Sequence, residues 1–183
     1  AESFAGLEAL LARLDAAEAS APGWVVVDAT CPAAGGDALA VAGGALEVAQ
    51  RLLADERLAS AELVWVTRGG IAAVEGDRLE GLSCAPLWGL VRAARSEHPE
   101  RGLRLIDLGS EEVDWDVLAA AVAVAGEPEL AVRGGEVLAA RLIRADVAGA
   151  ADNNSTSTST SDRSDSGGVA RALDPEGTVL VTG

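Results

Sequence analysis

Histidine and cysteine, which often act as catalytic bases or nucleophiles, are few in this chain of 183 residues, and they lie far apart in the sequence. His98 is the only histidine, and the two cysteines, Cys31 and Cys84, lack the close spacing of a zinc site. The chain contains no lysine and no tyrosine, which excludes a Schiff base, a P-loop lysine and a tyrosine–lysine proton donor. A single imidazole also excludes a multi-histidine metal centre. Most catalytic schemes therefore lack a component within this sequence.

The reactive groups that remain have structural interpretations. His98 lies where a helix is expected to end, and an imidazolium is favoured at that end of the helix dipole. Ser83 and Cys84 have no base near them in the sequence, so a nucleophile would have no partner. The carboxylates between positions 111 and 116 fall at the start of a helix, where capping explains them. An enzyme that uses His98 or Cys84 as its catalytic group stays open as an alternative.

Glycine-rich segments that could hold a phosphate are incomplete. A buried strand is expected at 24–28, but the residues after it, 28–36, do not form the G-x-G-x-x-G turn of a dinucleotide site. Gly43-Gly44 falls inside a helical pattern, where close helix packing is the expected reason for it. Arg68 follows a second strand and could in principle hold a 2′-phosphate, but without a phosphate loop before it we expect a turn.

A different signal stands at the end of the sequence. Gly177-Thr-Val-Leu-Val-Thr-Gly183 is a short β-branched run that closes on Thr-Gly. The first strand of a Rossmann unit enters its glycine-rich turn in this way. We therefore expect the chain to be the front part of a larger protein, with the remaining glycines of the turn beyond Gly183.

Strand and helix patterns alternate three times, which predicts an α/β fold. The strands are apolar without strict alternation, as in a mostly parallel sheet that is covered by helices on both faces. A helix over 4–18 with Ser3 as its N-cap opens the chain, and a small hairpin arm is expected at 71–77. Ser110 is expected to cap the helix around Trp115. The other elements are strands at 24–28, 63–67 and 103–108, a helix at 37–53 with Asp37 as its cap, a helix at 86–97 with Pro86 in its first turn, and a hairpin at 129–142 with a two-glycine turn.

Charge and composition narrow the partners. The net charge of −15 argues against nucleic acid and against an anionic membrane surface, because both need clustered cations. No apolar stretch reaches the ~20 residues of a membrane span, and the start of the chain is not a signal peptide. We expect a cytoplasmic protein in which Cys31 and Cys84 are free thiols rather than a disulfide.

Residues 146–176 differ in character from the rest of the chain. The run from Asn153 to Gly168 contains no hydrophobic residue and cannot compensate the entropy of ordering. The sequence therefore predicts a disordered linker, rich in serine and threonine, between the α/β body at 1–145 and the strand at 177–183.

Several segments together resemble one known family. The most distinctive is Pro86-Leu-Trp-Gly-Leu-Val-Arg-Ala-Ala-Arg-Ser-Glu-His-Pro99, which is similar to the structural subdomain of ketoreductase domains in modular type I polyketide synthases. The segments 63–69, 105–108 and 129–142 resemble the same subdomain in the same order, and 177–183 resembles the opening of the catalytic subdomain.

The resemblance implies a truncated Rossmann-like body of the short-chain dehydrogenase/reductase type that binds no nucleotide. It would support a second subdomain that binds NADPH and reduces the β-keto group of a chain tethered to an acyl carrier protein. Thr182 and Gly183 are the positions that match the cofactor loop of that subdomain. The linker lies where fully reducing modules insert an enoylreductase between the two subdomains. The resemblance therefore implies an enoylreductase as a neighbour of this chain. A stand-alone degenerate Rossmann-like module that binds a nucleotide or an acyl carrier protein is the alternative.

Overall fold

The structure is a computed structural model that describes residues 2–16, 21–31, 36–112 and 114–142. In these residues five strands form one sheet, in the order in which they follow along the chain. The strands from β1 to β4 are parallel, and β5 pairs antiparallel with β4. The mostly parallel sheet predicted from the sequence is thus confirmed. The strands are β1 Trp24–Asp28, β2 Glu62–Arg68, β3 Leu103–Leu108, β4 Glu129–Arg133 and β5 Glu136–Ala139.

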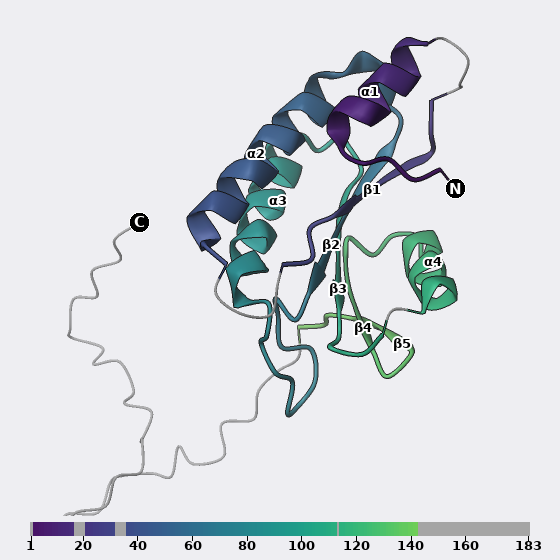
Figure 1. Cartoon of the computed structure of the whole chain (residues 1–183). Helices are drawn as coiled ribbons and strands as arrows, with labels where there is room; N and C mark the ends of the chain where they lie inside the picture. The colour runs from purple at the N-terminus through teal and green to yellow at the C-terminus, as the bar shows by residue number, and fades with distance from the viewer. Residues whose placement is uncertain (1, 17–20, 32–35, 113, 143–183) are drawn as a thin grey trace, which may run out of the picture. The chain divides into compact units, whose positions relative to one another are not determined.

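Helices cover both faces of this sheet (Figure 1). One face of β2 and β3 packs against α2 and α3 through Leu63, Trp65 and Leu105, and the other packs against α4 through Val66 and Ile106. The helices are α1 Leu7–Asp15, α2 Ala38–Ala54, α3 Ala85–Glu97 and α4 Trp115–Ala123, with short 3₁₀ turns η1 Glu56–Leu58 and η2 Leu82–Cys84.

The crossover connections between the parallel strands do not all have the same handedness. Four parallel strands that follow in chain order would carry all their connecting helices on one face if every crossover were right-handed. Because α4 lies on the face opposite α2 and α3, the β3–α4–β4 crossover has the opposite hand to the two before it. The fold is therefore a Rossmann-like sheet with one irregular crossover.

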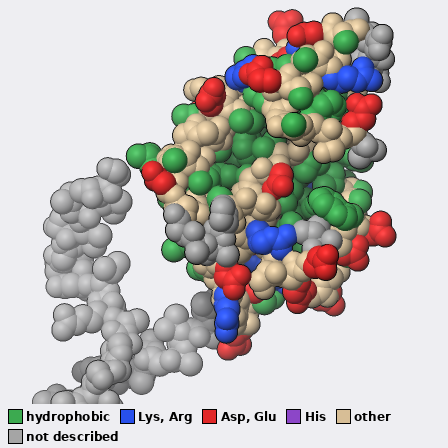
Figure 2. All heavy atoms as spheres, viewed as in Figure 1, with side chains coloured by type: hydrophobic (Ala, Val, Ile, Leu, Met, Phe, Trp, Pro, Cys, Tyr) green, Lys and Arg blue, Asp and Glu red, His purple; other side chains and the backbone are tan. Residues whose placement is uncertain are grey.

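The edge strand β1 is covered on one face only. Val25 packs into the core, whereas Trp24 is 53% exposed and Val26 is 48% exposed. Apolar side chains gather in the middle of the face shown in Figure 2, over the sheet between α1 and α4. The expectation of a sheet buried on both faces therefore holds for β2 and β3 but not for β1.

Two buried arginines, one within β3 and one just before it, bind the carboxyl ends of helices. Arg104 donates to the carbonyl oxygens of Ala121, Val122 and Val124 at the end of α4, at 3.1, 2.5 and 2.8 Å. Arg101 does the same for the end of α2 through the carbonyl oxygen of Leu53, at 2.8 Å. The last carbonyl groups of a helix have no partner within it, so these guanidinium groups satisfy acceptors that would otherwise be buried alone.

Several local predictions are confirmed. Asp37 caps α2 by accepting from the amide of Leu39 at 2.9 Å. Pro86 lies in the first turn of α3, and His98 is the residue at which that helix ends. The hairpin between β4 and β5 turns through Gly134 and Gly135, whose φ angles of 56° and 79° suit the turn type of a two-residue hairpin.

Other local predictions are wrong. The first helix begins at Leu7, after Gly6 with φ 147°, so Ser3 does not cap it. Residues 71–77 form no hairpin; the Asp77 carboxylate instead accepts from the amide of Ala73 at 2.7 Å and closes a loop. The N-cap of α4 is Asp114 rather than Ser110, because its carboxylate accepts from the amide of Asp116.

The glycines of α2 also differ from expectation. Close packing was the predicted reason for Gly43 and Gly44, but a Cβ atom built at either position meets no atom within 4 Å in the described structure. The outward face of α2 carries an exposed apolar side chain, since Leu39 is 81% exposed. The predicted linker at 146–176 and the strand at 177–183 lie outside the described residues.

Candidate functional site

The carboxyl edge of the sheet, where Rossmann-like folds bind ligands, contains a buried carboxylate. Asp107 lies on β3 and is fully buried. Its Oδ1 accepts from the hydroxyl of Thr67 at 2.6 Å and from the amide of Gly70 at 2.9 Å. Its Oδ2 accepts from a guanidinium nitrogen of Arg133 at 2.7 Å. A buried carboxylate with this set of partners is fully satisfied within the protein.

Arg133 connects this carboxylate to the loop that follows β2. The guanidinium of Arg133 donates to the Oδ2 of Asp77 at 2.9 Å and to the carbonyl oxygen of Ile71 at 3.0 Å. Burial works against the charged guanidinium, but the hydrogen bonds to Asp107 and Asp77 outweigh it and raise the pKa of Arg133. The pKa of Asp77 is lowered, chiefly by the backbone hydrogen bond from Ala73. Arg133 therefore remains charged and holds the loop over the sheet edge.

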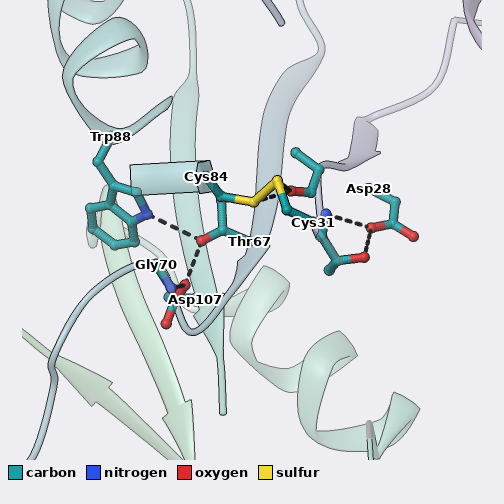
Figure 3. The surroundings of a disulfide bond; sticks show 9 residues. Asp28, Cys31, Thr67, Gly70, Cys84, Trp88 and Asp107 are labelled. Atoms are coloured by element: carbon teal, nitrogen blue, oxygen red, sulfur yellow. Dashed lines mark hydrogen bonds between the residues drawn. A yellow bond between two sulfur atoms is a disulfide. The ribbon is translucent and has the colours of Figure 1, made fainter. Parts of the chain in front are cut away.

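An indole group extends the network towards α3. The Nε1 of Trp88 donates to the Oγ1 of Thr67 at 3.1 Å, and Thr67 in turn donates to Asp107 (Figure 3). Trp88 is 4% exposed, so its ring separates these polar groups from solvent on the side of α3. The chain of hydrogen bonds runs from a helix through β2 to β3, and its members are oriented by one another.

The cysteine prediction is wrong in this structure. Cys31 and Cys84 form a disulfide, with their Cα atoms 6.1 Å apart, next to the Thr67 network (Figure 3). Because the two cysteines are 53 residues apart in the sequence, local patterns could not predict that they lie close together. It arises because β1 and β2 pair in parallel, which brings the loop after β1 beside the 3₁₀ turn that precedes α3.

The hollow at this edge is small. Its volume is about 210 Å³, below the roughly 300–1,000 Å³ of sites that bury a drug-sized ligand. The residues around it include Asp77, Arg78, Glu111 and Arg133. Arg133 is already paired with two carboxylates, at 2.9 and 2.7 Å, so it is not available as a phosphate ligand. As described, the hollow suits neither the size nor the charge of a dinucleotide.

Two other candidates named from the sequence, Arg68 and His98, contact groups of the protein itself. Arg68 donates to the carbonyl oxygens of Gly109 and Glu111 at 2.6 and 2.7 Å, which supports the turn interpretation over a 2′-phosphate ligand. His98 lies at the end of α3 and contacts Glu100 at 3.5 Å. Thr182 and Gly183 lie outside the described residues. Within the described ranges, no group of three or more His, Cys, Asp or Glu side chains could hold a metal ion.

The charged pair at the centre of the network, Asp107 and Arg133, was not singled out in the sequence. Asp107 interrupts the apolar run of β3, and a charged residue within a buried strand was the available signal. Its partner Arg133 is 26 residues away and follows from the pairing of β3 with β4.

Comparison with known proteins places these features in a family. The family model described as "Polyketide synthase extender module SpnB, Rossmann fold domain" matches residues 2–142. The chain belongs to this family. It is 40% identical over 183 residues to polyketide synthase GfsB of Streptomyces halstedii, covering 96% of this chain and 3% of that protein. It is 42% identical over 152 residues to the spectinabilin polyketide synthase system protein NorB of Streptomyces orinoci, covering 79% of this chain and 7% of that protein.

Solved ketoreductases share the fold. The structure of an A1-type ketoreductase matches 72% of this chain with a TM-score of 0.51 and 40% identity, and the match covers 28% of that chain. A C2-type ketoreductase from a modular polyketide synthase matches 60% of this chain with a TM-score of 0.50 and 33% identity, and the match covers 24% of that chain. The region resembles the structural subdomain of such ketoreductases, as the sequence predicted. The chain spans less than a tenth of the length of the curated relatives named above.

None of the helices that the structure describes is both long and apolar enough to span a bilayer.

Proposed function

We propose that this chain is the non-catalytic, structural half of a polyketide synthase ketoreductase. The observation that carries the proposal is the network of ion pairs and hydrogen bonds at the carboxyl edge of the sheet, between β2 and β4. Where a Rossmann-like fold would hold a nucleotide, the ion pair of Asp107 with Arg133 and its link to Asp77 occupy the site. The side chains at this edge are bound to one another, so the body is suited to support a neighbouring subdomain rather than to bind a cofactor.

The residue inventory supports the same assignment. The sequence has no tyrosine and no lysine, so a proton donor of that type has to come from another part of the polypeptide. The body at 1–145 would be the structural subdomain, 146–176 the linker, and 177–183 the first strand of the catalytic subdomain. Thr182 and Gly183 would then open the loop that binds NADPH.

The substrate and partners follow from the family. The catalytic subdomain of the same polypeptide would reduce the β-keto group of a chain carried by the acyl carrier protein of the module, with NADPH as the hydride donor. An enoylreductase at the linker would be a further neighbour. No nucleic acid or membrane is needed in this scheme, and a cytoplasmic location suits it.

The test is NADPH consumption with a small β-keto thioester, by this chain alone and by a longer polypeptide that continues through the catalytic subdomain. We expect turnover only from the longer polypeptide, and no NADPH binding by this chain alone. Turnover by this chain alone would contradict the proposal. NADPH affinity without turnover would favour the alternative of a degenerate binding module.

A further inference from the structure

The disulfide joins two elements that meet at the carboxyl edge of the sheet. Cys31 follows β1 by three residues, and Cys84 is the N-cap residue of α3 (Figure 3). We propose that this pair is a redox-sensitive tether, which a disulfide oxidant closes and a dithiol reductant opens while the chain remains folded. Three features of the surroundings support this assignment.

The first feature is the unequal exposure of the two cysteine residues. Cys84 is fully buried, whereas Cys31 is partly exposed. Thiol–disulfide exchange requires that a thiolate reach one sulfur atom of the bond. An external thiolate can therefore attack the Sγ of Cys31, and Cys84 is the leaving group. The bond is open to exchange from one side without unfolding of the core.

The second feature is a partner for the released thiol. The carbonyl oxygen of Ala29 lies 3.2 Å from the Sγ of Cys84 and 3.6 Å from the Sγ of Cys31. In the disulfide neither sulfur carries a proton, so these are close contacts only. After reduction the Cys84 thiol can donate to this carbonyl, which satisfies the buried S–H group. The reduced state thus has a place for its new proton inside the existing fold.

The third feature is what the tether holds. A Cβ atom at Gly36 would lie 2.9 Å from the Oγ of Ser83, so the far end of the β1–α2 connection also rests on the 3₁₀ turn that contains Cys84. Trp88 lies one helical turn beyond Cys84 and donates to Thr67. Closing the bond therefore fixes β1 to the start of α3, directly beside the buried hydrogen-bond network.

Reduction and oxidation of the Cys31–Cys84 bond each transfer two electrons and two protons. In reduction, a thiolate of the dithiol attacks the Sγ of Cys31, the bond between Cys31 and Cys84 breaks, and Cys84 takes up a proton. The second thiol of the reductant then attacks the mixed disulfide, which releases Cys31 as a thiol and leaves the reductant oxidised. In the reverse direction the two thiols lose two protons and two electrons to a disulfide oxidant, which is reduced to two thiols.

The experiment equilibrates the full chain with graded ratios of oxidised to reduced glutathione, and circular dichroism follows the fold in each sample. Free thiols are then labelled with N-ethylmaleimide in denaturant, because Cys84 is buried in the native fold, and the intact protein is weighed. We expect one reversible change between an unlabelled and a doubly labelled protein, with helical and strand signals retained. The oxidised form should melt roughly 5–15 °C above the reduced form, because the bond closes a long loop.

Variants separate the tether from general stability. Cys31→Ser changes the more exposed partner and should remove the difference in melting temperature between oxidising and reducing buffers, as should Cys84→Ala. If Cys84→Ala fails to fold, Cys31→Ser alone decides, because it leaves the buried position intact. Double labelling under fully oxidising conditions would overturn the proposal, since the bond would not form. A native protein that dithiothreitol in excess cannot reduce would overturn it too, since the bond would be fixed.

Discussion

Arg133 on β4 and Asp107 on β3 form an ion pair of 2.7 Å in which the carboxylate is fully buried and the guanidinium is 11% exposed. The pair joins two adjacent strands at the edge where related folds bind ligands. It also fixes the loop after β2 through the second contact of Arg133, with Asp77. The same side chains thus close the site and hold the sheet together.

Removal of the Asp107 carboxylate should leave the guanidinium of Arg133 with Asp77 as its remaining carboxylate partner, and it should leave the hydroxyl of Thr67 and the amide of Gly70 without their acceptor. We expect Asp107→Ala to lower the free energy of unfolding by about 3–5 kcal/mol, the usual cost of breaking a buried pair. Arg141→Ala is the matched control, because Arg141 pairs with Glu127 at the surface and is 62% exposed. Its loss should cost less than about 1 kcal/mol. Urea unfolding of both variants measures the difference, and equal effects would contradict the role given to the buried pair.

Trp88 should stabilise the fold and take no part in the reaction. Its ring is 4% exposed and its Nε1 donates to Thr67 at 3.1 Å, so Trp88→Ala should lower the free energy of unfolding by about 3–5 kcal/mol. Trp115, at 74% exposure, serves as the control, and Trp115→Ala should change stability by less than about 0.5 kcal/mol. In the longer ketoreductase polypeptide, turnover per folded molecule of Trp88→Ala should equal that of the parent. Normal stability with lost turnover would show that Trp88 acts in catalysis.

Regular elements could be predicted because their signals are local. The apolar runs at 24–28, 63–67 and 103–108 contain the cores of three strands, of which the second and third are buried on both faces. A carboxylate before an apolar helical pattern identified Asp37 as a cap. The two-glycine turn predicted the hairpin after β4, because only glycine adopts such φ angles without strain.

The hydrogen-bond network and the disulfide at the carboxyl edge of the sheet could not be predicted in the same way. The partners of Asp107 come from positions 67, 70 and 133, and their proximity depends on which strands pair. The disulfide depends likewise on the pairing of β1 with β2, since its cysteines are 53 residues apart. Local patterns identify elements, whereas the contacts at this edge depend on sheet topology. The resemblance to the ketoreductase family supplied the assignment that local patterns could not.

Acid should lower the free energy of unfolding, because it protonates the Glu129 carboxylate. The hydrogen bond from Arg92, with a further one from Arg95, lowers the pKa of this carboxyl to about 2 from an ordinary 4.5, although burial opposes the shift. A carboxyl group whose pKa is lower in the native state than in the unfolded state stabilises the native state. This stabilisation is complete above the ordinary pKa of 4.5, and it is lost as the pH falls towards the native pKa of about 2. Since Arg92 is 54% exposed, solvent screening reduces the gain to about 1–2 kcal/mol.

The check is the unfolding free energy of Glu129→Gln against the parent chain as a function of pH. We expect the variant to be less stable at pH 7 by about that amount, with the gap closing between pH 4.5 and about 2. Glu127→Gln is a surface control, since its partner Arg141 is well exposed. A gap that stays constant down to pH 2 would show that the charge of Glu129 does not contribute.

Substitution by alanine should lower the stability of the chain at Gly81 and raise it at Gly43. A Cβ atom at Gly81 would lie 1.8 Å from the carbonyl oxygen of Arg68, so Gly81→Ala has to displace the backbone of the loop that Arg133 holds over the sheet edge. Gly43 lies inside α2 with no atom within 4 Å of its Cβ position, so Gly43→Ala adds helix propensity without a clash. We expect Gly81→Ala to destabilise the chain by at least about 2 kcal/mol and Gly43→Ala to stabilise it by about 0.5–1 kcal/mol. Thermal melting of the two variants beside the parent measures both signs. A loss of stability in Gly43→Ala would show that another part of the polypeptide packs closely on α2 at this position.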